Sequence, residues 1–220
     1  MLRRIRFGPV RILGLPLGQV SAVLVLLCIL GAGTALQTTP WSSDLLLYYH
    51  GISVAPNNRV VKNNLAIELS KRGYYEEAIA MFQRTLETDP ENWVTLSNIG
   101  YAYFRLGKLD EADRHLTRAI EIYWNNPGPY LSLGLVKQSQ GKLDEAARNI
   151  RESITLRPNG DGLHEALGNV LRQQGELAGA LEQYRTEIEL HPERSSARED
   201  MNEVEAILAA REGLGKENRK

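Results

Sequence analysis

Hydrophobic positions along this chain follow two different patterns. Residues 12–43 carry no charged side chain, and the densest apolar part runs from residue 20 to residue 36. From residue 59 onward, small and bulky apolar residues recur among polar ones at intervals typical of amphipathic helices. The chain therefore divides into an apolar N-terminal segment and a longer helical body.

The apolar segment has the length of a membrane-spanning helix. A helix of about 20 apolar residues crosses the hydrocarbon core while satisfying all of its backbone hydrogen bonds internally. We expect residues 12–36 to form a transmembrane helix, or signal anchor, after a basic leader at 1–11. A cleaved signal peptide is the alternative, with Gly33-Thr34-Ala35 as a small-x-small cleavage site.

The flanking charges predict the orientation of this span. Four arginines precede it, and no lysine or arginine follows it before Arg59. Positively charged flanks tend to stay in the cytoplasm. The sequence thus predicts a single-pass membrane protein with a cytoplasmic N-terminus, whose body lies on the exterior side, either periplasmic or lumenal.

The body contains a repeat with a fixed period of 34 residues. Three series of small residues share this spacing, and bulky apolar residues recur at the same step. The members are Ala66, Gly100, Gly134 and Gly168; Gly73, Gly107, Gly141 and Gly175; Ala78, Ala112, Ala146 and Ala180; and the bulky Phe82, Leu116, Ile150 and Tyr184. A period of this size indicates a stack of similar supersecondary units.

Four units follow from the period, at 59–92, 93–126, 127–160 and 161–194. Each is predicted to be a helix, a tight turn and a second helix. The glycine at the fifteenth position of each unit suits the left-handed conformation that ends a helix, and Pro90, Pro158 and Pro192 stop the second helix in three units. In the middle units we expect Asp110 and Asp144 to cap the second helix.

These positions resemble the tetratricopeptide repeat (TPR), a family of 34-residue hairpins with small residues at positions eight and twenty and a frequent proline at position thirty-two. The resemblance covers residues 59–194 and implies an all-α fold, a right-handed α-solenoid of four helix-turn-helix units. Two residues depart from the family pattern: Lys137 replaces a large apolar residue, and Glu187 replaces an alanine. We expect looser packing between neighbouring helices at these two residues, which we call joints.

A stack of hairpins needs a cover at each end, because a terminal hairpin would otherwise expose its apolar face. We expect a C-terminal capping helix over residues 195–211, begun by Ser195 and Ser196, and a tail at 212–220. At the other end, the linker at 37–58 is predicted to contain a short helix at 42–54 that covers the first unit.

The resemblance also implies a binding surface, because in this family the first helix of each hairpin lines a concave groove. The predicted groove residues are mostly polar, and many are amides: Asn63, Asn64, Lys71, Asn98, Tyr101, Arg105, Gln138, Asn169 and Arg172. Amides can bond the backbone of an extended peptide, and the cations can bind carboxylates. Asn64 and Asn98 occupy the same position in their repeats. This resembles the O-linked N-acetylglucosamine transferase, in which stacked asparagines of the repeats grip the backbone of the substrate peptide.

Composition argues against other kinds of function. The chain has 26 basic and 27 acidic residues, and four of the basic ones lie in the first 36 residues; 22 basic therefore face 27 acidic beyond them, a net charge of −5. Nucleic-acid binding needs a basic face. The single cysteine, Cys28, and four histidines offer no metal-type pair, and no phosphate-binding loop or nucleophile elbow occurs. We predict no enzyme activity, cofactor, metal or nucleic-acid partner.

The sequence thus predicts a membrane-anchored TPR scaffold that binds a protein or peptide segment in its groove. Two alternatives remain open. The linker, with Trp41, Asp44 and Pro56-Asn57-Asn58, resembles the C-terminal end of polytopic membrane glycosyltransferases that carry such repeats. The chain would then be an accessory or truncated module of a sugar-transfer system. Short anchored arrays also serve as pilus or secretion assembly factors.

Overall fold

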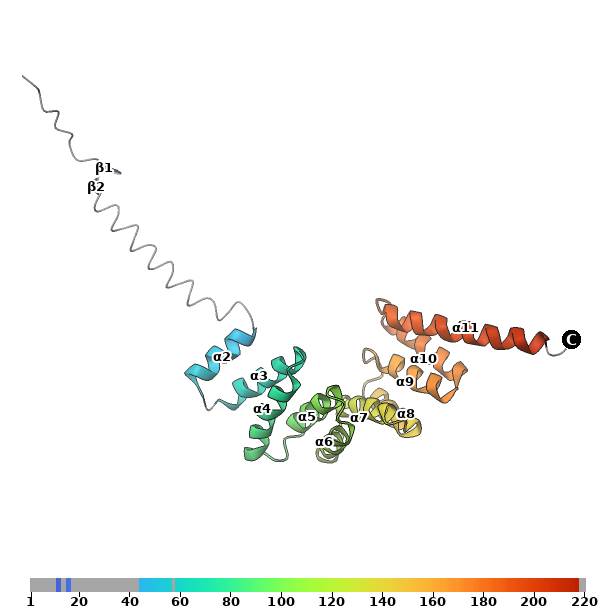
Figure 1. Cartoon of the computed structure of the whole chain (residues 1–220), viewed down its shortest axis with the longest axis horizontal. Coiled ribbons are helices and arrows are strands. Elements are labelled where there is room, and N and C mark those ends of the chain that lie inside the picture. Colours follow the sequence, from blue (N-terminus) through green and yellow to red (C-terminus); the bar gives the residue numbers. More distant parts are fainter. Residues whose placement is uncertain (1–10, 13–14, 17–43, 57, 218–220) are drawn as a thin grey trace, which may run out of the picture. The chain divides into compact units, whose positions relative to one another are not determined.

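The computed structural model describes residues 11–12, 15–16, 44–56 and 58–217. Two short strands, β1 (Arg11–Ile12) and β2 (Leu15–Pro16), pair antiparallel. The other elements described are helices (Figure 1): α2 (Asp44–Val54), α3 (Arg59–Lys71), α4 (Tyr75–Thr88), α5 (Trp93–Arg105), α6 (Leu109–Ile122), α7 (Pro127–Ser139), α8 (Leu143–Leu156), α9 (Leu163–Gln174), α10 (Leu177–Leu190) and α11 (Ser195–Glu217). The chain divides into two compact units, residues 1–65 and 66–220, each described by itself.

The N-terminal predictions fall mostly outside the described residues. The expected membrane span at 12–36 begins with Ile12, Leu15 and Pro16, which belong to the strand pair and not to a helix. The remainder of the span, most of the leader at 1–11 and the cleavage site at 33–35 lie outside the described ranges. Within those ranges, no helix combines the length and the apolar character that crossing a membrane requires.

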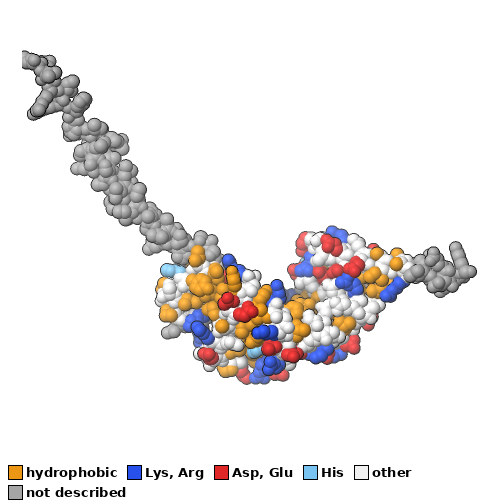
Figure 2. Space-filling view, in the orientation of Figure 1, with side chains coloured by type: hydrophobic (Ala, Val, Ile, Leu, Met, Phe, Trp, Pro, Cys, Tyr) orange, Lys and Arg blue, Asp and Glu red, His pale blue; other side chains and the backbone are white. Residues whose placement is uncertain are grey.

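In the first unit, α2 corresponds to the short helix predicted in the linker and lies close to the start of α3. A Cβ added to Gly51 would come within 2.9 Å of Cγ1 of Val61. The Asn58 side chain begins α3 by accepting a hydrogen bond from the Val60 amide at 3.0 Å. Apolar side chains remain exposed in this unit (Figure 2), among them Leu46, Tyr49, Val54 and Val60.

In the second unit, first and second helices of the hairpins alternate along the stack. The first helices α5, α7 and α9 each pack against the second helix of their own hairpin, α6, α8 and α10, and each second helix packs against the next first helix. First helices also touch directly, α5 with α7 and α7 with α9. The predicted all-helical stack of hairpins is confirmed.

Close approach of the two helices within a hairpin depends on the small residue at position eight. A Cβ added to Gly100, Gly134 or Gly168 would lie 2.5–2.6 Å from a side-chain carbon at position twenty-four of the same hairpin. Those partners are Leu116, Ile150 and Tyr184, each 0% exposed. The alanines at position twenty are likewise 0% exposed, so both small-residue series act where the sequence predicted.

The turns between paired helices also follow the prediction, but the helix starts do not. Gly73, Gly107, Gly141 and Gly175 all have positive φ, between 73° and 88°. First helices are capped by asparagine: Asn92 Oδ1 accepts from the Thr95 amide at 3.0 Å, and Asn126 Oδ1 accepts from the Gly128 amide at 2.9 Å. These caps were not predicted.

The predicted caps of the second helices are wrong. The residues that precede α6 and α8 are Lys108 and Lys142, and neither makes a side-chain cap bond. Asp110 and Asp144 instead lie in the first helical turn, where a carboxylate complements the helix dipole. Their oxygens accept bonds from the next hairpin, from Gln140 at 3.4 Å and from Gln174 at 2.7 Å.

The joint at Lys137 is bridged by ion pairs rather than loosened. The Lys137 ammonium lies 2.6 Å from Asp113 and 3.1 Å from Glu145, and its side chain is only 13% exposed. Burial opposes the charged form, but the hydrogen bonds with the two carboxylates outweigh it and raise the pKa of Lys137. One cation therefore links the second and third hairpins in place of an apolar contact.

The joint at Glu187 is likewise closed, by a carboxylate that caps a helix. Glu187 is 0% exposed, and its oxygens accept bonds from the amides of Gly162 (2.8 Å), His164 (3.1 Å) and Glu165 (3.3 Å). The fourth unit has Gly160 where earlier units have a capping asparagine. Glu187 supplies the missing acceptor from α10, and its negative charge suits a helix N-terminus.

The capping helix α11 is longer than predicted. It begins at Ser195, as expected, but continues to Glu217, through most of the predicted tail at 212–220. Ala197 and Val204 are fully buried, and Met201, Ile207 and Leu208 pack against the core of the last hairpins. Acidic and basic side chains are interspersed over the region of α10 and α11 (Figure 2).

The contact at position eight predicts that two glycine-to-alanine substitutions change the stability of the protein in opposite directions. Gly134→Ala should destabilise the protein by about 1–3 kcal/mol, because the new Cβ overpacks against Ile150, whereas Gly179→Ala in α10 should stabilise it by up to about 1 kcal/mol. At Gly179 the added Cβ meets only Leu171, at an ordinary 3.4 Å. Urea unfolding followed by circular dichroism measures both. Stabilisation by both substitutions would contradict the packing argument.

The cap that Glu187 forms on α9 predicts that removal of its carboxylate destabilises the start of this helix. Glu187→Ala leaves three amide donors without their acceptor, so we expect a loss of at least about 2 kcal/mol. Hydrogen exchange should quicken first at the start of α9 and in α11. Glu187→Gln, which keeps the size and one carbonyl oxygen, serves as the matched variant and should fall between the two proteins. Equal protection of α9 in all three would show that the cap is dispensable.

Candidate functional site

The first helices of the second unit share one surface. We define the first-helix surface as the side of α5, α7, α9 and the C-terminal part of α3 that carries positions five, six, nine, twelve and thirteen of the repeat. Two pockets open on this surface. One lies between the first and second repeats and the other between the third and fourth.

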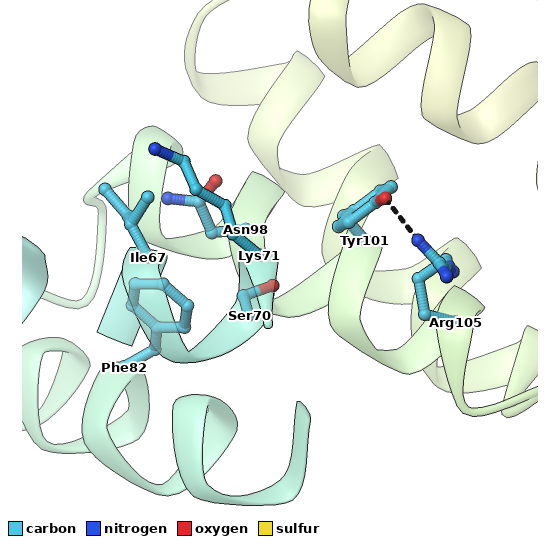
Figure 3. A pocket seen from close by; sticks show the side chains of 7 residues that line it. All are labelled: Ile67, Ser70, Lys71, Phe82, Asn98, Tyr101 and Arg105. Carbon is cyan, nitrogen blue, oxygen red and sulfur yellow. Dashed lines mark hydrogen bonds between the residues drawn. The ribbon is translucent and has the colours of Figure 1, made fainter. Parts of the chain in front are cut away.

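The first pocket has a volume of about 180 Å³ and is lined by four of the predicted groove residues, with Lys71 and Asn98 on one side and Tyr101 and Arg105 on the other (Figure 3). Its lining consists of Ile67, Ser70 and Lys71 from α3, Phe82 from α4, and Asn98, Tyr101 and Arg105 from α5. Ile67 gives it an apolar part, with the fully buried Phe82 behind it, while its other side chains are polar or cationic. Lys71, Asn98, Tyr101 and Arg105 were all predicted from their repeat positions.

Arg105 is held in place by two aromatic rings. Its Nη1 donates a hydrogen bond to the hydroxyl of Tyr101 at 2.8 Å (Figure 3), and its guanidinium carbon lies 5.1 Å from the centre of the Tyr75 ring. The bond to Tyr101 raises the pKa of Arg105. Both partners are uncharged, so the guanidinium is oriented while its charge stays available for an anion.

Lys71 adds a second cation that is weakly paired. Its ammonium lies 3.9 Å from Glu68, and its side chain is 70% exposed. Glu68 makes its closer contact with Arg72, at 2.8 Å. The rim of the first pocket is therefore electropositive, because no described carboxylate pairs with Arg105 and the nearest acid to Lys71 is already engaged.

The second pocket, about 280 Å³, is aliphatic with a paired polar rim. Its lining consists of Leu131, Leu135 and Gln138 from α7, Gly162, Glu165, Ala166 and Asn169 around the start of α9, and Asp161 and Arg194. Gln138 and Asn169 were predicted. Arg194 lies 2.6 Å from both Asp161 and Glu165, and its hydrogen bond lowers the pKa of Asp161. Both acids of this rim are therefore paired with a single arginine, which leaves the rim with a net negative charge.

Arg172, also a predicted groove residue, forms ion pairs with the capping helix. It lines neither of these pockets and forms ion pairs with Asp200, at 3.8 Å, and Glu203, both on the capping helix α11. Asn169 is partly committed as well, because its Oδ1 accepts the hydroxyl of Tyr184 at 2.8 Å. The first-helix surface thus ends beyond α9, where α11 packs against it.

Asn63 and Asn64 lie in the other compact unit and line neither pocket. Both are half-buried, and Oδ1 of Asn63 is buried without a hydrogen-bond partner. Among the described residues that sequence reasoning missed are Tyr75, Leu131 and Arg194. A signal existed for Tyr75: it precedes Arg105 by 30 residues, the same offset that separates Asp110 from Gln140 and Asp144 from Gln174.

One group of potential metal ligands also escaped the search for histidine pairs. Asp161, Glu187 and His191 offer ligand atoms within 4.8 Å of one another. The Arg194 guanidinium lies 2.6 Å from Asp161 and 3.7 Å from Glu187 and supplies positive charge to both carboxylates. This arrangement serves the helix cap and the joint with α11.

Stacked hairpins with a continuous surface of first helices define an α-helical repeat protein of the solenoid class. Two family models described as tetratricopeptide repeat match residues 69–131 and 131–195, more than half of the chain between them. The protein belongs to the tetratricopeptide repeat family. No curated protein matches it significantly in sequence.

Solved structures with the same fold include three informative ones. A thermophilic TPR protein of Thermus thermophilus, TTC0263, is 21% identical, with a TM-score of 0.65, over 73% of this chain and 88% of that one. YrrB, a TPR protein with an unusual peptide-binding site, is 22% identical, with a TM-score of 0.59, over 75% and 85%. The first TPR of Spaghetti (RPAP3), bound to the HSP90 peptide SRMEEVD, is 26% identical, with a TM-score of 0.51, over 53% and 93%.

The ion pairs of Arg172 predict a structural effect. Arg172→Ala should destabilise the docking of α11 by about 1 kcal/mol, a modest value because the partners are partly solvated, and should speed amide exchange over residues 195–208. Arg185→Ala is the control, because its pair with Glu205 is more exposed, at 61% and 46%. If the control loosens α11 as much as Arg172→Ala does, the assignment of Arg172 is wrong.

Proposed function

We propose that this protein is an interaction scaffold that binds an extended segment of another protein on its first-helix surface. The observation that carries the proposal is the state of Arg105, which is oriented by Tyr75 and Tyr101 and has no carboxylate partner among the described residues. A cation fixed in this way at the rim of a pocket is prepared to bind an anionic group.

The amides of the surface support binding of a peptide backbone. Asn98 lines the first pocket, and Gln138 and Asn169 line the second. Each carboxamide has donors and an acceptor, so it can bond the main chain of a ligand whatever its side chains are. The Spaghetti (RPAP3) repeats, which share this fold, are bound to a peptide that contains two glutamates and an aspartate.

The proposal assigns the chain a binding role and no catalytic step. The membrane anchor at 12–36, and with it a position of the array on the exterior side of a membrane, stays a prediction from the sequence. The two alternative roles, in a sugar-transfer system and in pilus or secretion assembly, also stay predictions.

Selection of peptides from a random display library against the full-length protein tests the proposal. We expect selected peptides to lose at least about tenfold in affinity for the Asn98→Ala/Arg105→Ala variant, because a charge-assisted contact and an amide contact are removed. A photoreactive residue at Tyr101 should crosslink to the same peptides. Fluorescence anisotropy measures the affinities.

Arg151→Gln is the matched control, because Arg151 is exposed on α8, a second helix, and lines neither pocket. It removes one positive charge without touching the first-helix surface. Circular dichroism should show that both variants are folded. Peptide affinities that are equal in the wild-type protein and the Asn98→Ala/Arg105→Ala variant would refute binding at this surface.

A further inference from the structure

We infer that the first unit lies against the surface of a lipid bilayer with anionic headgroups, through exposed apolar side chains of α2 and the start of α3. We call this surface the N-terminal patch. It consists of Leu46, Tyr49, Val54 and Val60. The inference goes beyond the proposed function and does not depend on it, because both pockets of the first-helix surface lie in the second unit.

The N-terminal patch is exposed to an unusual degree. Val54 and Val60 are 72% and 68% exposed, more than any other large apolar side chain that the structure describes. On α2, Tyr49 and Val54 follow Leu46 by three and eight residues, so these side chains share one face of the helix. Figure 2 shows hydrophobic side chains gathered over this region. A group of large apolar side chains at this exposure indicates contact with another surface.

The chain that precedes α2 indicates a bilayer as that surface. No charged residue occurs at 12–43, and the densest apolar part ends at residue 36. The seven residues 37–43 separate it from α2. An extended chain covers about 3.3–3.6 Å per residue, so these residues span at most roughly 25 Å. If the apolar part enters a bilayer, as the sequence predicts, the N-terminal patch stays within that distance of the bilayer surface.

The charge of the first unit favours anionic lipids over a second copy of the protein. Residues 1–65 contain six basic residues and one acidic residue, a net charge of +5, whereas residues 66–220 contain 20 basic and 26 acidic ones, a net charge of −6. Arg59 and Lys62 lie on either side of Val60 in α3. Two copies that met at the N-terminal patch would bring like charges together. Basic residues beside an apolar surface are instead attracted to anionic headgroups.

The composition of α2 suits the interface between lipid and water. Its 11 residues are too few to cross a bilayer, and they include one acidic residue, Asp44, at the start, and no lysine or arginine. Tyr49 can place its ring in the apolar layer and its hydroxyl among the headgroups. Ser53, on the same face, donates to the His50 carbonyl at 2.7 Å, which lowers the cost of removing its hydroxyl from water.

Fluorescence quenching in the full-length protein tests the inference. Cys28→Ser removes the native thiol, and a single new cysteine, from Val54→Cys or Arg151→Cys, carries the environment-sensitive dye NBD. The protein is reconstituted into vesicles of phosphatidylcholine and phosphatidylglycerol that contain a spin-labelled lipid as quencher. We expect NBD at residue 54 to be quenched and its emission to shift to the blue. NBD at residue 151, which is exposed on α8 in the second unit, should show neither effect.

Two glutamate substitutions form a matched pair. Val60→Glu places a carboxylate in the N-terminal patch and should reduce the quenching at residue 54 by at least about twofold. Val94→Glu, at an exposed valine of α5 in the second unit, should leave the quenching unchanged. Replacement of phosphatidylglycerol by phosphatidylcholine should weaken the quenching, because the attraction of the basic residues is lost. Circular dichroism should show that both variants are folded.

Three results would overturn the inference. The first is quenching at residue 54 that is no stronger than at residue 151. The second is quenching at residue 54 that Val60→Glu does not reduce. The third is emission at residue 54 that shifts with protein concentration in detergent but is not quenched by lipid, because a second copy would then cover the N-terminal patch. Each of these results leaves peptide binding on the first-helix surface standing.

Discussion

The close contact between the two helices of each hairpin is the constraint on which the rest of the structure depends. Glycine at position eight lets a bulky side chain at position twenty-four lie against the backbone of the first helix, as Gly134 does for Ile150. Because this contact recurs in the second, third and fourth hairpins, these hairpins have similar shapes and stack with the same faces. The stack then buries apolar surface that no single hairpin could bury. The first-helix surface exists because this packing leaves one side of each first helix unused.

Departures from the repeat pattern are tolerated where a polar side chain finds a complete set of partners. Lys137 has two carboxylates, and Glu187 has three backbone amides. In both cases a buried charge is paired across a joint, so the cost of removing it from water is offset by hydrogen bonds. The joints are therefore not weak points. Lys137 binds the second hairpin to the third, and Glu187 binds α10 to the start of α9 within the fourth.

The fold could be predicted from the sequence because its determinants are local and repeated. A glycine with positive φ or an alanine fully buried at a fixed step needs no knowledge of distant residues. Four of the predicted groove residues meet in one pocket for the same reason. The ion pairs of Arg172 could not be predicted, because its partners lie on α11, which follows no repeat position. The expectation of loose packing at Glu187 was wrong because Glu187 caps α9 in place of the asparagine that is missing at Gly160. Both residues depart from the repeat pattern, so the pattern alone could not relate them.

The division between packing residues and surface residues explains how such an array can acquire specificity without losing stability. Arg105 and Lys71 contribute little to the contact between helices, since one is held by tyrosine rings and the other is largely exposed. An unpaired cation at the surface gives small stability, but in a pocket it can give a large difference in affinity between ligands with and without a carboxylate. Tyr75 and Tyr101 make this difference larger, because they reduce the freedom of Arg105 before any ligand arrives. The repeat thus supplies a rigid spacing, and the residues that the repeat does not specify decide what that spacing recognises.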